Sequence, residues 1–406
     1  MPGWNATEGS LGTPRGFRAA AVASGIKTSA GALDLALLFS DAPQTAAAGV
    51  FTSNRAAAAP VILSQQNLKK SRGRARAIIV NSGNANACTG RAGTKAAEET
   101  ARATAKSLGL SPQEVLVAST GVIGTPLKLD LILKKLPTLQ KNLSAENGPA
   151  LARAIMTTDT FPKSAVFTTK FRGRSVSLAG VAKGAGMIHP NMATMLSFIT
   201  TDAAVDPRSL QKMLRAAVDE SFNRITVDGD TSTNDTVVAL ASGLSGVSMG
   251  PGSPAGRSFQ AGLIELCQAL AKMIVQDGEG ATKVARIEVS GARNAADAER
   301  VARAIANSPL VKTAIAGSDP NWGRILCAAG YSGAKIDPSK VDIRVNDLYL
   351  CRHGIETGFN EAAARTELDR KEHTLRVDLH QGKARAWVWT CDLTHDYIRI
   401  NASYRS

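Results

Sequence analysis

Short apolar runs recur along the chain and predict buried strands, because they are rich in Val, Ile and Leu and are bounded by polar or glycine-containing turns. The runs cover residues 32–39, 76–81, 115–119, 165–169, 175–181, 195–201, 236–241, 284–289, 341–345, 375–379 and 385–389. The pair at 165–169 and 175–181 is typical of a hairpin. Residues 1–30 are polar and contain glycine, which predicts an irregular lead-in.

Longer segments with helix-favouring residues predict helices at 94–108, 127–136, 207–222, 259–276 and 295–307. Asp206 followed by Pro207 is typical of a helix start, and Gly109 of a helix end. Helices and strands mix without strict alternation, and the sequence has no visible internal repeat. The pattern therefore predicts the α/β (α+β) class, built as a layered α/β sandwich, and disfavours a doubly wound parallel sheet.

Composition places the chain among globular proteins. Its 406 residues are 44% hydrophobic, which allows a large core and two or three domains. No apolar run approaches the ~18 residues that a membrane-spanning helix needs, so no membrane partner is expected. The N-terminus lacks the basic start and apolar stretch of a signal peptide, which predicts a cytoplasmic protein. Five scattered cysteines without a C-x-x-C pair fit reduced thiols better than disulfides or a zinc site.

The net charge of +14 is compatible with a nucleic-acid partner. The basic residues are dispersed, however, and their densest cluster, at 69–76, is short and lacks aromatic residues. A solvated basic turn is the simpler interpretation of this cluster, so we expect no nucleic-acid partner. A positive potential would also attract dicarboxylate substrates.

Residues 183–202, near the middle of the chain, combine a loop with a buried strand. Two glycines and a proline exclude a regular helix before the strand at 195–201. Thr194, preceded by the small residue Ala193, would therefore stand at the mouth of this strand.

A threonine in that position suits self-cleavage. Its hydroxyl can attack the carbonyl of Ala193 and form an ester, and hydrolysis of the ester leaves Thr194 as a new N-terminus. The α-amine, with an ordinary pKa of ~7.7–8.0, is then a base beside the hydroxyl that it must activate. This segment alone leaves open the alternative of an ordinary threonine at a strand start.

Seven motifs follow one another along the chain. They are Asn81-Ser-Gly-Asn-Ala-Asn-Ala-Cys-Thr-Gly90, Ser119-Thr-Gly-Val-Ile-Gly124, Ile155-Met-Thr-Thr-Asp159, Lys183-Gly-Ala-Gly-Met with His-Pro-Asn-Met-Ala-Thr194-Met-Leu, Asp228-Gly-Asp-Thr-Ser-Thr-Asn-Asp235, Gly317-Ser-Asp-Pro-Asn-Trp-Gly-Arg324 and Asn401-Ala-Ser-Tyr-Arg-Ser406. Together they resemble the ornithine acetyltransferase family, the glutamate N-acetyltransferases of arginine biosynthesis, also called the ArgJ family. The likeness runs from about Gly16 to the last residue. It implies the DmpA/ArgJ-like fold of self-processing aminopeptidases, and cleavage into an alpha chain, 1–193, and a beta chain, 194–406.

The resemblance also implies an oxyanion hole formed by Thr120 and Gly121. Gly121 has no side chain to obstruct its N–H group, and the Thr120 hydroxyl supplies a second donor. Without the resemblance, a Thr-Gly pair is most simply a turn.

Substrate binding is likewise implied by the resemblance. The residues concerned are Thr157 (with Thr158 as the alternative), Lys183, Thr194, Glu279, Asn401 and Ser406. The Lys183 ammonium can hold a substrate carboxylate or lower the pKa of the nucleophile, and Glu279 can pair with the amino group of ornithine or glutamate. From the residues alone, a surface lysine and a solvated loop acid remain the alternatives.

The implied reaction is a two-step acetyl transfer from N2-acetylornithine to glutamate through an acetyl-Thr194 intermediate. No metal or organic cofactor is expected, because the enzyme itself carries the acetyl group. Some family members also accept acetyl-coenzyme A, and no residue here decides that second activity. The implied assembly is a heterotetramer of two alpha and two beta chains. A self-processing aminopeptidase, which would hydrolyse its substrate, is the alternative function.

The turn at 228–235 is similar to a calcium-binding loop in its spacing of acidic and polar residues. Its sixth position is not glycine, and Ala239 occupies the twelfth, where calcium needs a bidentate acid. A structural or site-lining polar turn is therefore favoured, and no metal site is predicted.

Overall fold

The computed structural model of the chain describes residues 3–189 and 195–403. Three residues named from the sequence, Ala193, Thr194 and Ser406, lie outside the described residues.

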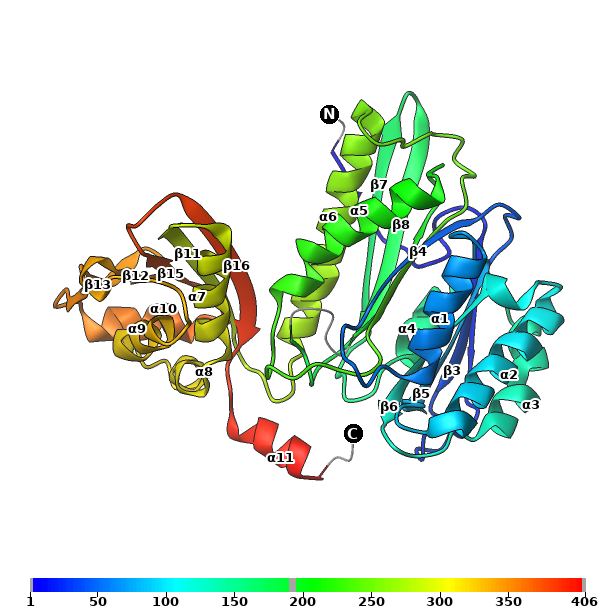
Figure 1. Ribbon diagram of the computed structural model, residues 1–406, viewed down its shortest axis with the longest axis horizontal. Coiled ribbons are helices and arrows are strands. Elements are labelled where there is room, and N and C mark those ends of the chain that lie inside the picture. Colours follow the sequence, from blue (N-terminus) through cyan, green and yellow to red (C-terminus); the bar gives the residue numbers. More distant parts are fainter. Residues whose placement is uncertain (1–2, 190–194, 404–406) are drawn as a thin grey trace.

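The central sheet contains the predicted strand that follows Thr194. Its strands are, in order, β1 (Asn5–Ala6), β7 (Lys163–Phe171), β8 (Arg174–Lys183), β9 (Leu196–Thr201), β10 (Thr236–Ala241) and β4 (Ala46–Phe51) (Figure 1). β9 is antiparallel to β8 and parallel to β10. All six residues of β9 are buried, because layers cover both faces of the sheet at this strand. This double burial explains why the strand is rich in apolar and β-branched residues.

A second sheet packs face to face with the first. Its strands are β2 (Phe17–Val22), β3 (Leu35–Ser40), β5 (Ala77–Asn84) and β6 (Val115–Val122). Side chains such as Leu38 and Ile78 meet Phe198 and Leu240 of the first sheet in a shared core, to which α4 (Gly148–Ala154) contributes Leu151. The two sheets therefore form the middle of a sandwich.

Helices cover the outer faces of both sheets. The first sheet is covered by α5 (Pro207–Asp219) and α6 (Pro254–Gln276), and the second by α1 (Ala59–Lys70), α2 (Gly90–Leu108) and α3 (Leu129–Lys141) (Figure 1). The result is a four-layer α/β sandwich, so the predicted fold class is confirmed. Asp206 caps α5 as predicted, accepting hydrogen bonds from the N–H groups of Arg208 and Ser209 at 3.1 and 3.0 Å.

The C-terminal part forms a third sheet with helices on one face. The strands are, in order, β14 (Ile355–Glu356), β13 (Leu348–Arg352), β12 (Asp342–Val345), β15 (Glu372–Asp378), β11 (Val284–Ala292) and β16 (Ala384–Cys391), and the helices are α7 (Ala295–Asn307), α8 (Pro309–Ala316), α9 (Trp322–Gly330) and α10 (Glu361–Asp369). Ile287 and Val289 point into the core beneath the helices, while Arg286 and Glu288 alternate onto the other face. The last helix, α11 (His395–Ser403), extends away from this lobe (red in Figure 1).

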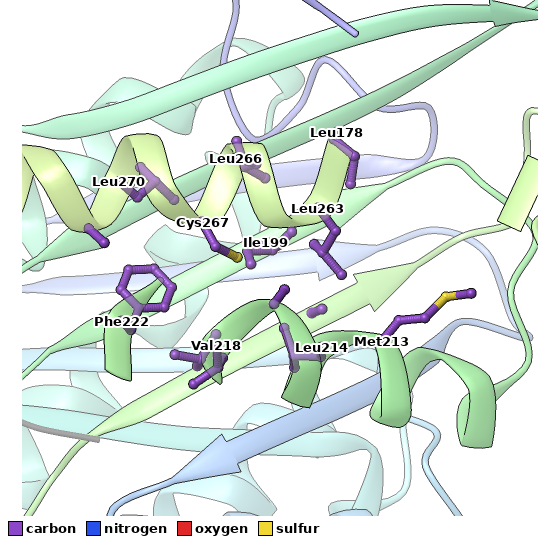
Figure 2. Close-up of a cluster of buried hydrophobic side chains, with 14 of the residues drawn as sticks. Leu178, Ile199, Met213, Leu214, Val218, Phe222, Leu263, Leu266, Cys267 and Leu270 are labelled. Atoms are coloured by element: carbon purple, nitrogen blue, oxygen red, sulfur yellow. The ribbon is translucent and has the colours of Figure 1, made fainter. Parts of the chain in front are cut away.

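α6 is the one helix in the described part of the chain that is long and apolar enough to cross a membrane, judged by length and composition. Its sequence includes Glu265 and Lys272, so the expectation that no uninterrupted apolar run approaches ~18 residues still holds. In Figure 2, Leu263 of α6 faces Leu214 of α5. Leu266 and Leu270 pack on the other side of the helix, against Gly180 of β8 in the central sheet. These buried contacts identify α6 as a core helix of the sandwich.

The strands predicted from apolar runs and the five predicted helices are all present, with ends shifted by a few residues. The irregular lead-in predicted for residues 1–30 is wrong, because β2 pairs with β3 and buries Phe17. The elements that the pattern missed are β4, α1, α4, α8, α9, β13, α10 and α11, together with the short strands β1 and β14 and the 3₁₀ turns η1 (Pro112–Glu114), η2 (Ala145–Asn147), η3 (Phe222–Arg224) and η4 (Pro338–Lys340).

We expect Leu266→Ala to lower the free energy of unfolding by about 2–5 kcal/mol, because it removes buried methyl groups and leaves a cavity. Leu310→Ala is the control, since Leu310 is 60% exposed and its truncation should change stability by no more than about 0.5 kcal/mol. Thermal unfolding followed by circular dichroism measures both variants. Equal effects would contradict the placement of α6 in the core.

Candidate active site

A polar cavity lies where the ends of several strands meet. Its lining residues are Ala85, Thr120, Gly121, Ile123, Thr157, Thr158, Lys183, Gly186, Met187, Ser232, Thr233, Asn234, Glu279 and Asn401. Every site residue named from the sequence and lying within the described residues is among them. The residues named from the sequence, from Thr120 to Asn401, are up to about 280 residues apart in the chain, so the tertiary fold brings them together.

Thr120 and Gly121 form a tight corner at the end of β6, beside the end of β5. The backbone of Gly121 has φ +128°, and a Cβ atom there would lie 2.4 Å from the carbonyl carbon of Gly83. Only glycine fits so close a strand pair in this conformation. The corner therefore presents the Gly121 backbone and the buried Thr120 hydroxyl to the cavity.

Lys183 ends β8 and is 3% exposed. Its Nζ donates a hydrogen bond to Thr120 Oγ1 at 3.3 Å. Burial lowers the pKa of Lys183, and the nearby Asp159 carboxylate opposes this effect. Because Thr120 accepts from the lysine, its own hydroxyl proton is left to donate to another group in the cavity.

A buried ion cluster supports the wall of the cavity. Lys163, fully buried, donates to Asp159 Oδ1 at 2.7 Å and to Asp277 Oδ2 at 2.5 Å. Burial by itself would raise the pKa of Asp159, but the ammonium groups of Lys183 and Lys163 and hydrogen bonds from Lys163 and Gly184 lower it to about 2. Asp159 is therefore ionised at neutral pH.

Asp159 also fixes the backbone of two site segments. Its Oδ2 accepts from the Thr157 N–H at 2.9 Å, and its Oδ1 accepts from the Gly184 N–H at 2.7 Å. Thr157 and Thr158 both line the cavity, so its lining includes the preferred residue and the alternative. Asp159 lies within one of the seven motifs, but no sequence pattern gives it a role, and none distinguishes Lys163 or Asp277.

Glu279 and Asn401 meet across the cavity edge. Asn401 Nδ2, from α11, donates to Glu279 Oε2 at 2.8 Å. The Glu279 N–H donates to Ala185 O at 2.9 Å, which ties the acid to the loop after β8. Helix α11 is thereby attached to the cavity through a residue predicted to bind substrate.

The polar turn at 228–235 joins the layers of the site. Asn234 Nδ2 donates to Ala85 O at 2.7 Å and to Ser119 O at 2.8 Å. Asp228 accepts from the N–H groups of Met187 and Ile188 at 2.6 and 2.9 Å. These contacts agree with the structural and site-lining turn predicted from the sequence. Within the described ranges, no group of three or more His, Cys, Asp or Glu residues is arranged to hold a metal ion.

Both ends of the connection between β8 and β9 are anchored near the cavity. Lys183 pairs with Leu196 across the two strands and lines the cavity. The N–H of Met195 donates to Asp235 Oδ1 at 2.8 Å, and Asp235 directly follows the lining residue Asn234. The connection that carries Thr194 therefore starts at a lining residue and ends at a residue bonded to the neighbour of another.

Comparison with known proteins identifies the family. The ArgJ family model matches residues 18–406. The chain is 50% identical over 400 residues to the arginine biosynthesis bifunctional protein ArgJ of Symbiobacterium thermophilum, covering 98% of this chain and 99% of the relative. It is also 50% identical over 394 residues to the protein of the same name from Geobacter sulfurreducens, covering 97% and 99%. A crystal structure of argJ from Bacillus halodurans is 48% identical with a TM-score of 0.51, and covers 52% of this chain and 100% of its own.

The layered α/β fold, the polar cavity and these matches define an acyltransferase of amino-acid biosynthesis. The chain belongs to the ArgJ family. The acetyltransferase of arginine biosynthesis predicted from the sequence is thereby confirmed over the aminopeptidase alternative.

We expect Lys163→Met to destabilise the protein by about 3–5 kcal/mol, because it leaves Asp159 and Asp277 buried without their shared cation. The control is Lys272→Met, which removes an ion pair with Glu372 that is exposed to solvent and worth no more than about 1 kcal/mol. Chemical denaturation of both variants tests this expectation. If the two variants unfolded alike, the buried ion cluster would not hold the cavity wall.

Proposed function

We propose that the chain cleaves itself between Ala193 and Thr194 and then transfers acetyl groups from N2-acetylornithine to glutamate. The observation that carries this proposal is the composition of the cavity. Thr120, Gly121 and Lys183 come from residues 1–193, whereas Glu279 and Asn401 come from residues 194–406. Each of the two proposed chains would thus supply half of one site.

Two further observations support the cleavage. The β8–β9 pairing spans the proposed cut, so hydrogen bonds between strands would hold the two chains together afterwards. The solved chain from Bacillus halodurans is matched in full by 52% of this chain. Residues 194–406 are 213 of the 406 residues, which is the same share.

In the first half-reaction, the Thr194 hydroxyl attacks the acetyl carbonyl of N2-acetylornithine while its own α-amine takes up the hydroxyl proton. The Thr120 hydroxyl and the Gly121 N–H would stabilise the oxyanion of the tetrahedral intermediate. As the amide bond breaks, the ammonium returns the proton to the departing amine. Ornithine leaves, and the acetyl group remains as an ester on Thr194.

In the second half-reaction, the amine of glutamate attacks this ester and the same donors hold the oxyanion. The proton from the attacking amine passes to Thr194 as the ester bond breaks, which releases N-acetylglutamate and restores the enzyme. The acetyl group is carried by the threonine, so the cycle needs no metal or organic cofactor. Acetyl-coenzyme A as a second acetyl donor would fit the relatives' description as bifunctional.

Substrate recognition would use charges already in the cavity. The Lys183 ammonium would hold a substrate carboxylate and Glu279 the amino group of ornithine or glutamate, since both residues line the cavity. Thr157 and Asn401 would add hydrogen bonds, with Ser406 and Thr194 completing the set. We further propose a cytoplasmic heterotetramer of two alpha and two beta chains, without a nucleic-acid or membrane partner.

We expect purified wild-type protein to show two chains, 1–193 and 194–406, on a denaturing gel, and Thr194→Ala to show one uncut chain. Thr194→Ser is the control, because its hydroxyl retains the nucleophile. Incubation of wild-type protein with N2-acetylornithine should add one acetyl group to the 194–406 chain, measured by mass spectrometry. Full-length wild-type protein would contradict the proposed mechanism.

We expect Thr120→Val to lower kcat on the order of 100- to 1,000-fold, because it removes one oxyanion donor while preserving side-chain shape. Ile123→Val changes another lining residue without removing a hydrogen-bond donor, and should leave kcat within about threefold of the wild type. Steady-state acetyl transfer measures both variants. If Thr120→Val instead raised KM and left kcat unchanged, the hydroxyl would be assigned to substrate binding.

A further inference from the structure

Asp235 is a buried acid to which the proposed mechanism gives no role. Its side chain is fully buried, directly before β10. Oδ1 accepts the hydrogen bond from the Met195 N–H at 2.8 Å. Oδ2 is buried and has no hydrogen-bond partner within residues 3–189 and 195–403. An acceptor in this state has lost its hydration without a replacement, which calls for an explanation.

The residue that follows the proposed nucleophile in the sequence, Met195, contacts this acid. The nitrogen of Met195 is bonded to the carbonyl carbon of Thr194. Standard bond lengths and angles keep the nitrogens of two successive residues within about 3.7 Å of each other. The Met195 nitrogen lies 2.8 Å from Asp235 Oδ1, so the acid contacts the residue that directly follows the proposed nucleophile in the sequence.

We propose that Asp235 is a positioning residue for the α-amine released at Thr194, with Oδ1 holding the Met195 amide and Oδ2 accepting a hydrogen bond from the amine. The inference rests on the proposed self-cleavage. Before cleavage, the nitrogen of Thr194 carries one hydrogen as a peptide amide. Hydrolysis consumes one water and gives a carboxyl group on Ala193 and an amine with two hydrogens, or an ammonium with three. Cleavage would thus create new N–H donors on the amine, and Asp235 Oδ2 is an acceptor without a hydrogen-bond donor among the described residues.

The electrostatics of Asp235 agree with this geometry. Burial raises the pKa of the Asp235 carboxyl well above its usual range, against smaller opposing effects of the Met195 amide, the Thr52 hydroxyl and the Lys183 ammonium. A positively charged amine beside it would favour the carboxylate form. The acid and the amine then titrate as a coupled pair, in which the carboxylate raises the pKa of the amine and Lys183 lowers it.

The coupled pair has a consequence for the pH dependence of the reaction. The amine acts as a base only when it is neutral, so activity rises as the pH passes upward through the pKa of the amine. Removing the carboxylate removes the effect that raises this pKa. The acidic limb of the pH profile should therefore move to lower pH, while the loss of orientation lowers the rate.

Asp235→Asn tests the proposal. The variant keeps an oxygen for the Met195 amide, and replaces the second oxygen with an NH₂ group that cannot accept from the amine. We expect the protein to be cut into two chains, with kcat lowered on the order of 10- to 100-fold and the acidic limb of kcat/KM shifted down by about one pH unit. The matched control is Asp202→Asn, at the other end of β9, where a buried carboxyl with a raised pKa accepts from the Ser177 N–H at 2.9 Å. It should keep the wild-type pH profile.

An unchanged kcat and pH profile in Asp235→Asn would overturn the inference, as would the same shift in Asp202→Asn. If Asp235→Asn does not fold, a crystal structure of the cut wild-type protein decides instead. An α-nitrogen of Thr194 within about 3.2 Å of Asp235 Oδ2 supports the proposal, and a separation beyond about 4 Å overturns it. Wild-type protein that stays uncut would overturn the proposed function as well. A cut, active enzyme with its amine away from Asp235 would overturn this inference alone.

Discussion

The antiparallel pairing of β8 with β9 is the constraint on which the site depends. Lys183 and Thr236 both stand opposite Leu196, on its two sides, so three strands begin or end at one level of the central sheet. β9 is buried on both faces, and a shift of its register by one residue would exchange the side chains that face the two cores. The frame around the connection to β9 is therefore fixed by packing, and strand hydrogen bonds would maintain it after a break in the backbone.

Buried charge is the second feature of this frame. Lys163, Asp159 and Asp277 lie together out of water, at a desolvation cost that their mutual attraction must offset. An ion cluster of this kind is weak evidence for extra stability. Here its geometry is informative, because Asp159 Oδ1 accepts from both the lysine and the Gly184 N–H, while Oδ2 accepts from the Thr157 N–H. The cluster thus sets the position of two cavity walls relative to each other.

The sequence predicted the parts of this arrangement that are encoded locally. The strand after Thr194 and the corner at Thr120 follow from apolar runs, glycine positions and the family motifs. β2 was missed because Arg18 and its alanines have little intrinsic strand preference, and its strand form comes from pairing with β3. The ion cluster was missed because Lys163 and Asp277 are 114 residues apart, and no local pattern distinguishes them from surface charges. Tertiary contact decides both cases.

The glycines of the central motif show how sequence and site are connected. Glycine next to a lysine in a loop is often taken for a phosphate-binding feature, but a Cβ atom at Gly186 would lie 2.3 Å from Glu279 Oε2. A side chain at position 186 would therefore fit only if Glu279, an acid 93 residues away in the sequence, moved, and that acid is in turn held by Asn401. A larger residue at position 186 would push Glu279 from the cavity edge and break its hydrogen bond with Asn401 of α11. The motif thus reflects the packing of three segments, those of Gly186, Glu279 and Asn401, around one cavity. These segments are far apart in the sequence, and this packing explains why the residue types of the motif are informative about the site.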